Sequence, residues 1–260
     1  MTLNLTREGA TAVLTMNRPA QRNALSPDLR AAFLDAFQSI RDDDAVKAVV
    51  LTGSGGHFCA GGDIKAMAQA REQGADAFSG RQRLLKMQRW FDMLVDLEKP
   101  VITAIEGSAF GAGLSLALAG DYAMAAPSAT FCAVFARIGY VPDLLGMYLL
   151  PRAVGLARAK EMVFTARVCN AEEALAMGLI QEICEGDVVE AALARAARFH
   201  AAPTQAIGLA KTIMNRAYES DREAVYAKEA MAQALCGQSG YHQEAARRFI
   251  EKQPPVYNWK

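Results

Sequence analysis

Two stretches decide the fold of this 260-residue chain: Phe58-Cys59-Ala60-Gly61-Gly62-Asp63-Ile64 and Glu106-Gly107-Ser108-Ala109-Phe110-Gly111-Ala112-Gly113. Each follows an apolar, strand-like run and precedes a helix-like run. The amides in the first turn of a helix have no intrahelical partner and carry partial positive charge. Two such turns that face each other would hold an oxygen that gains negative charge during a reaction. The alternative is that the small residues only let a helix pack closely on a strand.

The composition is typical of a globular protein, because 52% of the residues are hydrophobic and can form a sizeable core. Lys+Arg and Asp+Glu both number 28. The formal net charge is therefore zero, whereas a nucleic-acid-binding protein usually has a basic excess. No apolar run is long enough for a membrane span, and the first residues lack the features of a secretory signal.

The cysteines indicate a reducing compartment, and we expect the cytoplasm. The five positions form no Cys-x-x-Cys pair, so neither zinc binding nor thioredoxin-type chemistry is indicated. They are Cys59, Cys132, Cys169, Cys184 and Cys236. The three histidines, His57, His200 and His242, show no metal-ligand spacing and no evident catalytic partner.

Strands alternate with helices along the first two hundred residues, which predicts an α/β architecture with crossover connections. Continuous apolar runs at 48–52 and 100–105 are typical of buried strands, and 13–16 and 122–125 add two more. The helix expected from Ser26-Pro27-Asp28 to about Ile40 has a capping serine and a proline at its first position.

Local sequence patterns also predict the structure of the later segments. Residues 67–80 resemble a mobile polar segment, and 81–97 an amphipathic helix. Pro142 and Pro151 are expected to bracket a short helix, and residues 170–178 to form a capped one. Beyond about residue 202 the pattern is wholly helical. We therefore expect a core of residues 1–201 and a helical oligomerisation region of residues 202–260.

Four sets of residues resemble motifs of the crotonase superfamily, which is also called the enoyl-CoA hydratase/isomerase family. They are Asn17-Arg18-Pro19 with Asn23-Ala24-Leu25; Phe58-x-Ala60-Gly61-x-Asp63-Ile64; Gly107-x-Ala109-x-Gly111-x-Gly113; and Gly139-x-Val141-Pro142 with Leu150-Pro151-Arg152. The resemblance covers nearly the whole chain. It implies a spiral of β-β-α turns, followed by helices that build a homotrimer or a dimer of trimers. It also implies acyl-CoA thioester substrates, with coenzyme A as part of the substrate and no separate cofactor.

The resemblance implies site residues as well. The N–H groups of Gly62 and Ala112 would be the two oxyanion donors, in agreement with the two amide-bearing turns. Residues near bound coenzyme A would be Arg22, Ala24, Ala60, Asp63 and Ile64, and Lys252 would touch coenzyme A on a neighbouring subunit. Alternatively, Arg22 and Lys252 are solvated surface side chains, and Asp63 only caps a helix.

The acid–base residues depart from the hydratase pattern. The family's hydratases use two glutamates to position water, and the matching positions here are Ser115 and Phe135, which makes one wall of the site apolar. The carboxylate that remains is Asp143, where several isomerases and dehalogenases of the family hold a catalytic aspartate. Alternatively, Asp143 caps a helix that starts at Leu144.

The leading hypothesis is an acyl-CoA isomerase in which Asp143 moves a proton between two carbons. The segment 135–152 looks most like the ring-epoxide isomerases of phenylacetyl-CoA degradation and the 3,2-enoyl-CoA isomerases. The alternatives are a hydratase that holds water by another group, a hydrolase or dehalogenase with Asp143 as nucleophile, and a non-catalytic acyl-CoA-binding oligomer. Glu106 and Ser115 receive no role from the sequence.

Overall fold

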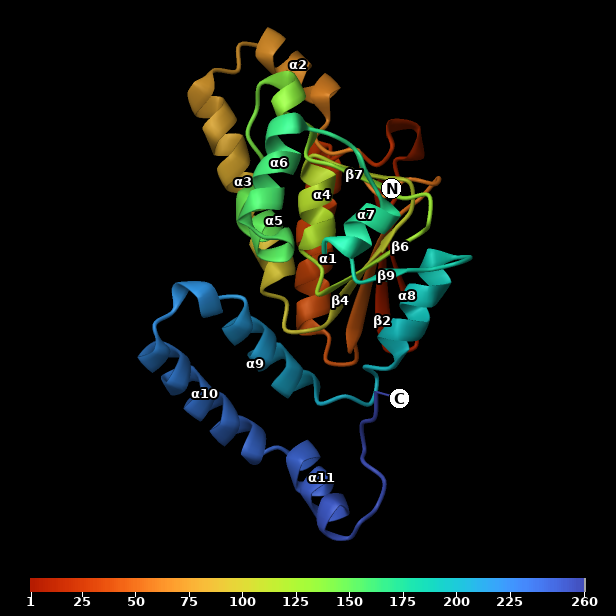
Figure 1. The fold of residues 1–260 in the computed structure, drawn as a ribbon, viewed down its shortest axis with the longest axis vertical. Helices are drawn as coiled ribbons and strands as arrows, with labels where there is room; N and C mark the ends of the chain where they lie inside the picture. Colours follow the sequence, from red (N-terminus) through yellow and green to blue (C-terminus); the bar gives the residue numbers. More distant parts are fainter. Residues whose placement is uncertain (260) are drawn as a thin grey trace.

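The computed structural model describes residues 1–259, and its largest element is a sheet of six strands (Figure 1). Their order across the sheet is β1 (Leu3–Glu8), β2 (Thr11–Met16), β3 (Ala48–Gly53), β4 (Val101–Ile105), β6 (Tyr122–Ala125) and β9 (Glu182–Ile183). The β1–β2 pair is antiparallel and all later pairs are parallel. The predicted α/β architecture and its four expected strands are confirmed.

A smaller sheet and the helices complete the fold. The sheet contains β5 (Ser108–Phe110), β7 (Thr130–Cys132) and β8 (Cys169–Asn170). The helices are α1 (Pro27–Asp42), α2 (Ile64–Glu72), α3 (Ala77–Val95), α4 (Ala112–Leu118), α5 (Gly146–Val154), α6 (Leu156–Thr165), α7 (Ala171–Ala176), α8 (Val188–Ala197), α9 (Thr204–Met214), α10 (Arg222–Gly237) and α11 (Gly240–Ile250), with 3-10 turns η1 (Pro19–Gln21), η2 (Val134–Ile138) and η3 (Ala217–Glu219).

Helices cover both faces of the large sheet, which explains why β3 and β4 are buried along their whole length. On one face, Val50 and Ile102 pack with Val188 and Ala192 of α8. The opposite face packs against α1, α3 and α4 in the main core. Aromatic rings join α1 to α3, since the centroids of Phe33 and Trp90 are 5.0 Å apart in a stacked arrangement.

Two sequence-based boundaries were wrong. Residues 67–80 are largely helical, because α2 extends to Glu72 and α3 begins at Ala77. Asp76 and Ser79 form a capping box that starts α3, with Ser79 N donating to the Asp76 carboxylate over 2.8 Å. Pro151 lies inside α5 and does not end it. The fixed φ of a proline is compatible with a helix, although its missing N–H removes one hydrogen bond. The helix α5 therefore continues past Pro151 to Val154.

The last three helices form an arm that extends away from the core (Figure 1). Within the described residues, α10 and α11 bury no side chain, and several large apolar side chains of the arm are exposed. These are Met214, Tyr218, Tyr226, Met231, Leu235, Phe249 and Ile250.

The division of the chain into a core of residues 1–201 and an oligomerisation region of residues 202–260 stays a prediction. Among residues 1–259, no helix has both the length and the apolar character required to span a bilayer.

One ion pair ties α9 to the core. Lys211 is 8% exposed, and its Nζ donates to the carboxylate of Asp121 over 2.8 Å and to the carbonyl of Lys99 over 3.3 Å. The same Asp121 carboxylate accepts the N–H of Val101 at the start of β4. Lys211 therefore links the first helix of the arm to the end of the sheet.

We expect Lys211→Met to lower the free energy of unfolding by about 2 kcal/mol, because hydrogen bonds to charged groups are worth about 1.5–3 kcal/mol. The measurement is urea unfolding at a fixed protein concentration. Arg222→Met is the control, since Arg222 and Glu223 form an ion pair whose side chains are 75% and 78% exposed. Equal stability of the two variants would contradict the assigned role of Lys211.

Candidate active site

The two stretches quoted first lie side by side in the structure. Cys59 N donates to Ser108 O and Phe110 N donates to Cys59 O, each over 2.9 Å, so the backbones pair as a parallel bridge. Glycine is required for this approach. A Cβ on Gly113 would lie 2.1 Å from Cys59 O, and one on Gly61 would lie 2.7 Å from Phe110 O. The sequence hypothesis that the two turns face each other is consistent with this pairing.

The amides of Gly62 and Ala112 lie at this junction. Ala112 is the first residue of α4, so its N–H has no intrahelical partner. Gly62 immediately precedes Asp63, the N-cap of α2. Among residues 1–259, neither N–H donates a hydrogen bond to the protein. A Cβ on the adjacent Gly61 would lie 3.3 Å from Ala112 N. Two unpaired amides close together can both donate to one oxygen.

Asp143 lies in the turn before α5, where its carboxyl is partly buried. Oδ1 is fully shielded from solvent and has no hydrogen-bond partner among the described residues. Burial raises the pKa of Asp143, while the positive charges of Arg83 on α3 and Arg30 on α1 oppose that rise. The capping alternative was wrong, because α5 begins at Gly146 and its N-cap, Leu145, makes no side-chain cap.

An apolar ring and a buried hydroxyl lie at the two positions that the motif resemblance matches to the hydratase glutamates. Phe135 in η2 is 7% exposed, and one of its ring atoms is 3.8 Å from where a Cβ on Gly111 would lie. Ser115, in the middle of α4, is 2% exposed, and its Oγ donates to the backbone carbonyl of Asp143 over 2.9 Å. Neither side chain supplies a carboxylate to this part of the molecule.

The segments predicted to bind coenzyme A come together in the fold. Ala60 N donates to Arg22 O over 2.9 Å, and Leu25 N donates to Gly61 O over 2.8 Å. The side chain of Arg22 is exposed, and its backbone is left-handed with φ 47°. Ala24 is buried, whereas Ile64 at the start of α2 is 54% exposed.

Two other predicted residues have different surroundings. The Asp63 carboxylate caps α2 by accepting Ala66 N over 3.1 Å, and its other oxygen is 3.1 Å from Arg18 Nη2. Asp63 therefore has a structural role in any case. Lys252 follows α11, which lies at the opposite end of the molecule from α2 (Figure 1). Within one chain, Lys252 is not brought to the other predicted residues.

Sequence reasoning missed several partners. Nothing in the sequence singles out Arg30 and Arg83, because only the packing of α1 and α3 brings their positive charges close enough to act on Asp143. Two of the histidines for which the sequence shows no evident catalytic partner form hydrogen bonds in the structure. Ser108 Oγ lies 3.1 Å from His57 Nδ1, and Thr11 Oγ1 lies 2.8 Å from His200 Nε2.

No third member completes a catalytic triad with the His57–Ser108 pair, since no carboxylate among residues 1–259 hydrogen-bonds to His57. Within the same described residues, no three His, Cys, Asp or Glu side chains are grouped so that they could hold a metal ion. The Gly62 and Ala112 amides and Oδ1 of Asp143 are thus polar groups of this region without a hydrogen-bond partner among the described residues.

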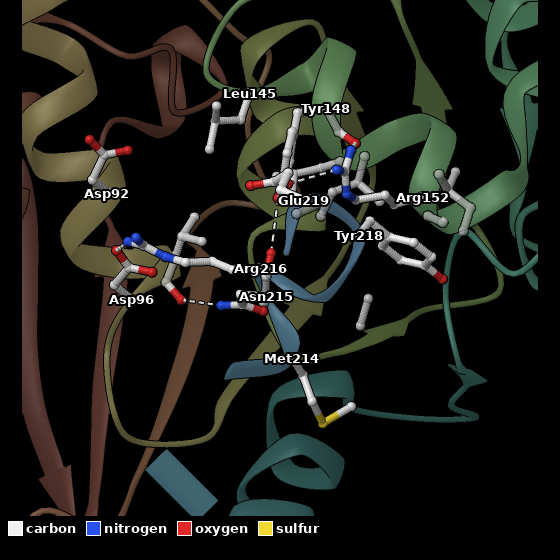
Figure 2. Close-up of a pocket in the computed structure, with 18 of the residues that line it drawn as sticks. Asp92, Asp96, Leu145, Tyr148, Arg152, Met214, Asn215, Arg216, Tyr218 and Glu219 are labelled. Carbon is white, nitrogen blue, oxygen red and sulfur yellow. Dashed lines mark hydrogen bonds and ion pairs between the residues drawn. The ribbon is translucent and has the colours of Figure 1, made fainter. Parts of the chain in front are cut away.

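A cavity of about 530 Å³ lies at the other end of α4, between α3, α5 and η3 (Figure 2). Several of its polar side chains are already paired: Tyr148 Oη donates to Asn215 O over 2.9 Å, and Arg152 Nη2 is 2.8 Å from the Glu219 carboxylate. Because it is lined by Ala117 and Leu118, the last residues of α4, it is distinct from the junction at Ala112.

Comparisons with known proteins agree with the motifs. The sequence model described as enoyl-CoA hydratase/isomerase matches residues 6–260. The 1,2-epoxyphenylacetyl-CoA isomerase of Escherichia coli K12 is 32% identical over 259 residues, covering 97% of each chain. The crotonyl-CoA hydratase of Syntrophomonas wolfei is 34% identical over 250 residues, covering 95% of this chain and 94% of that protein.

Solved structures also match along the whole chain. An enoyl-CoA hydratase/isomerase from Cupriavidus metallidurans CH34 has a TM-score of 0.90 at 35% identity, covering 99% of this chain and 96% of that one. An enoyl-CoA hydratase from Polaromonas sp. JS666 has a TM-score of 0.91 at 32% identity, covering 98% and 99%. The fold expected from the motif resemblance is confirmed by these matches.

The raised pKa of Asp143 generates a prediction about stability. The folded protein holds the Asp143 proton more tightly than the unfolded chain, so Asp143 lowers stability as pH rises through the folded-state pKa. We expect Asp143→Asn to be more stable than the wild type near pH 7, and this advantage to disappear at pH values below the ordinary pKa of an aspartate. The measurement is thermal unfolding at several pH values.

Asp43→Asn is the control with the opposite sign. The hydrogen bond from Ala45 N, 2.9 Å long, lowers the pKa of Asp43, with Arg7 adding to the effect. This variant should therefore lose stability near pH 7 and approach the wild type in acid. A neutral-pH loss of stability in Asp143→Asn would contradict the assigned surroundings of that carboxyl.

Proposed function

The chain belongs to the enoyl-CoA hydratase/isomerase family, and on that premise we propose that it is an acyl-CoA isomerase with Asp143 as proton shuttle. The observation that carries the proposal is a single partly buried carboxyl, with an unpartnered oxygen and a raised pKa, at the turn that Ser115 of α4 contacts. The family makes the chain an enzyme of acyl-CoA thioesters. The choice of isomerisation is our inference.

In this proposal the amides of Gly62 and Ala112 donate to the thioester carbonyl oxygen. The proton on the carbon next to a thioester is weakly acidic until that oxygen can take up negative charge. Each oxyanion donor contributes about 3 kcal/mol to the stability of the transition state. Both amides are backbone groups fixed at the ends of secondary elements, so they need little reorganisation when charge develops.

Asp143 then removes a proton from C2 of a 3-enoyl thioester. The C2–H bond breaks, an O–H bond forms on the carboxyl, and the electron pair spreads over the dienolate whose oxygen the two amides hold. The same carboxyl returns the proton to C4, so the double bond moves to C2–C3 with no net gain or loss of atoms. Burial raises the pKa of Asp143, which makes its ionised form a stronger base than an exposed aspartate.

Hydration of a 2-enoyl thioester is the second candidate, because the relatives include hydratases such as that of Syntrophomonas wolfei. Hydration needs groups that orient and deprotonate a water molecule. At the two matching positions this chain has Ser115, whose hydroxyl is bonded to Asp143 O, and the apolar Phe135. These residues support isomerisation over hydration. Asp143 as a nucleophile and acyl-CoA binding without turnover are further alternatives that the assay below separates.

Coenzyme A is part of the substrate in this proposal, and no separate cofactor takes part. We assign Arg22, Ala24, Ala60, Asp63 and Ile64 to the region around it, and Phe135 to the acyl wall. Asp63 would act through its cap of α2, and Lys252 would reach coenzyme A on a neighbouring subunit. All five cysteines are free thiols, which suits the proposed cytoplasmic location.

We expect Asp143→Asn to lower the turnover of 3-enoyl-CoA at least about a hundredfold while leaving the Kd for the coenzyme A ester unchanged. The assay is incubation of the purified protein with 3-enoyl-CoA and 2-enoyl-CoA in deuterated water, followed by mass spectrometry. Double-bond migration supports the proposal. The control is Asp92→Asn, because burial also raises the pKa of Asp92 but its side chain lines the separate cavity.

Other outcomes of this assay have defined meanings. Hydration of 2-enoyl-CoA at an enzymatic rate, without migration, would favour the hydratase. Full turnover by Asp143→Asn would remove Asp143 from the mechanism. Tight binding of both esters with no chemical change would identify a binding protein.

The exposed apolar arm supports a homotrimer or a dimer of trimers. Phe249 and Ile250 at the end of α11 are 86% and 79% exposed, and such side chains are usually covered by another protein surface. We expect sedimentation to give a species at least three times the 28.0 kDa chain mass, and Phe249→Asp to weaken the association. A wild-type protein that sediments only as the single chain would contradict this prediction.

A further inference from the structure

The turn that carries Asp143 is strained. Leu144 and Leu145 both have left-handed backbones, with φ values of 46° and 56°. This conformation costs a residue with a side chain about 1–2 kcal/mol. Two successive residues of this kind normally include glycine, asparagine or aspartate. Such strain persists only where the surrounding structure determines the conformation, and it is concentrated at functional sites.

Contacts on two sides determine the conformation of this turn. Leu144 is 5% exposed and belongs to the main core, and Leu145 packs against that core. The carbonyl of Asp143 accepts two hydrogen bonds, from Gly146 N and from Ser115 Oγ, each 2.9 Å long. The first closes the turn on itself. The second is the one side-chain hydrogen bond between α4 and this turn.

Ser115 also fits closely against the end of the turn. A Cβ on Gly146 would lie 2.7 Å from Ser115 Oγ and 3.1 Å from Pro142 Cβ, so the hydroxyl fills the space between the helix and the turn. Ser115 follows Ala112 by three residues on the same helix. Its position is therefore about 4.5 Å along the helix axis from the amide at the start of α4.

We infer that Ser115 is a positioning residue for the proton transfer: its hydroxyl fixes the strained turn and so directs the Asp143 carboxyl toward the substrate. The inference rests on the proposed role of Asp143. The helix α4 then positions both the oxyanion donor and the proton carrier, since the Ala112 N–H lies at its start and Ser115 donates to the Asp143 carbonyl. The single hydrogen of the hydroxyl is committed to that carbonyl, so Ser115 is not available as a donor to water or substrate.

The inference predicts how the carboxyl changes when the hydroxyl is removed. Charged groups that act on Asp143 are Arg83 from α3 and Arg30 from α1, and both lower its pKa, whereas burial raises it. Without the Ser115 bond the turn can relax and the carboxyl can reach water. Burial would then contribute less, and the pKa of Asp143 would fall toward its ordinary value.

The test compares Ser115→Ala with Thr52→Val. Thr52 is also buried, and its Oγ1 donates to Ala104 O over 2.9 Å inside the large sheet. Each variant loses one buried hydroxyl-to-carbonyl bond. We expect Ser115→Ala to lower kcat about tenfold or more with little change in KM, because small displacements of a reacting group strongly reduce rates. The acidic limb of its pH–rate profile should move to lower pH. Thr52→Val should keep the wild-type kcat and profile.

A second measurement does not depend on turnover. Titration of the Asp143 carboxyl by carbon-13 NMR, assigned by its loss in Asp143→Asn, should show a lower pKa in Ser115→Ala than in the wild type. If Ser115→Ala does not fold, Ser115→Cys, which keeps a weak donor, should give an intermediate shift. Unchanged kcat and unchanged titration in Ser115→Ala would overturn the inference. A wild type without isomerase activity would overturn the proposed function, whereas the titration would still decide the position of the carboxyl.

Discussion

The site depends on one backbone contact, the pairing of Cys59 with Ala109. It brings the turn after β3 alongside β5, although the two are separated by α2, α3 and β4 in the chain. The pairing is possible because Gly61 and Gly113 have no side chain, since a Cβ on either would overlap backbone atoms of the other stretch. A substitution that separates the stretches would separate the Gly62 and Ala112 amides, whatever else it left intact.

The Asp143 carboxyl owes its properties to opposing effects. Burial favours the neutral acid, while Arg83 and Arg30 favour the ionised base. Burial is the larger effect, so the pKa is raised. A group that accepts a proton from one carbon and returns it to another needs both forms to be accessible near the working pH. An exposed aspartate would hold the proton too weakly. An aspartate buried without nearby positive charge would have a pKa too high for its ionised form to be well populated.

The sequence predicted the parts of the site that depend on local backbone pattern. Apolar runs located β3 and β4, and the glycine-rich stretches marked the starts of α2 and α4, because strand ends and helix starts have strong local signals. The choice of Gly62 and Ala112 within these stretches came from the resemblance to the family. It missed the helical character of residues 67–80, where alanine and glycine obscured good helix formers and the Asp76 cap. It also missed Ser115 and Arg30 as neighbours of Asp143, because these contacts arise only when α1, α4 and the turn pack together.

In the proposed function, the same packing favours isomerisation over hydration. A hydratase needs two groups that share a water molecule, and therefore needs room and polarity opposite the oxyanion donors. Here Phe135 lines the start of α4, and Ser115 uses its hydrogen on the backbone of Asp143. In the proposed isomerase, the partly buried carboxyl of Asp143 acts in place of the two glutamates that hold water in the family's hydratases. A partly buried carboxyl suits a proton that must leave and rejoin the same substrate, because burial limits its contact with water.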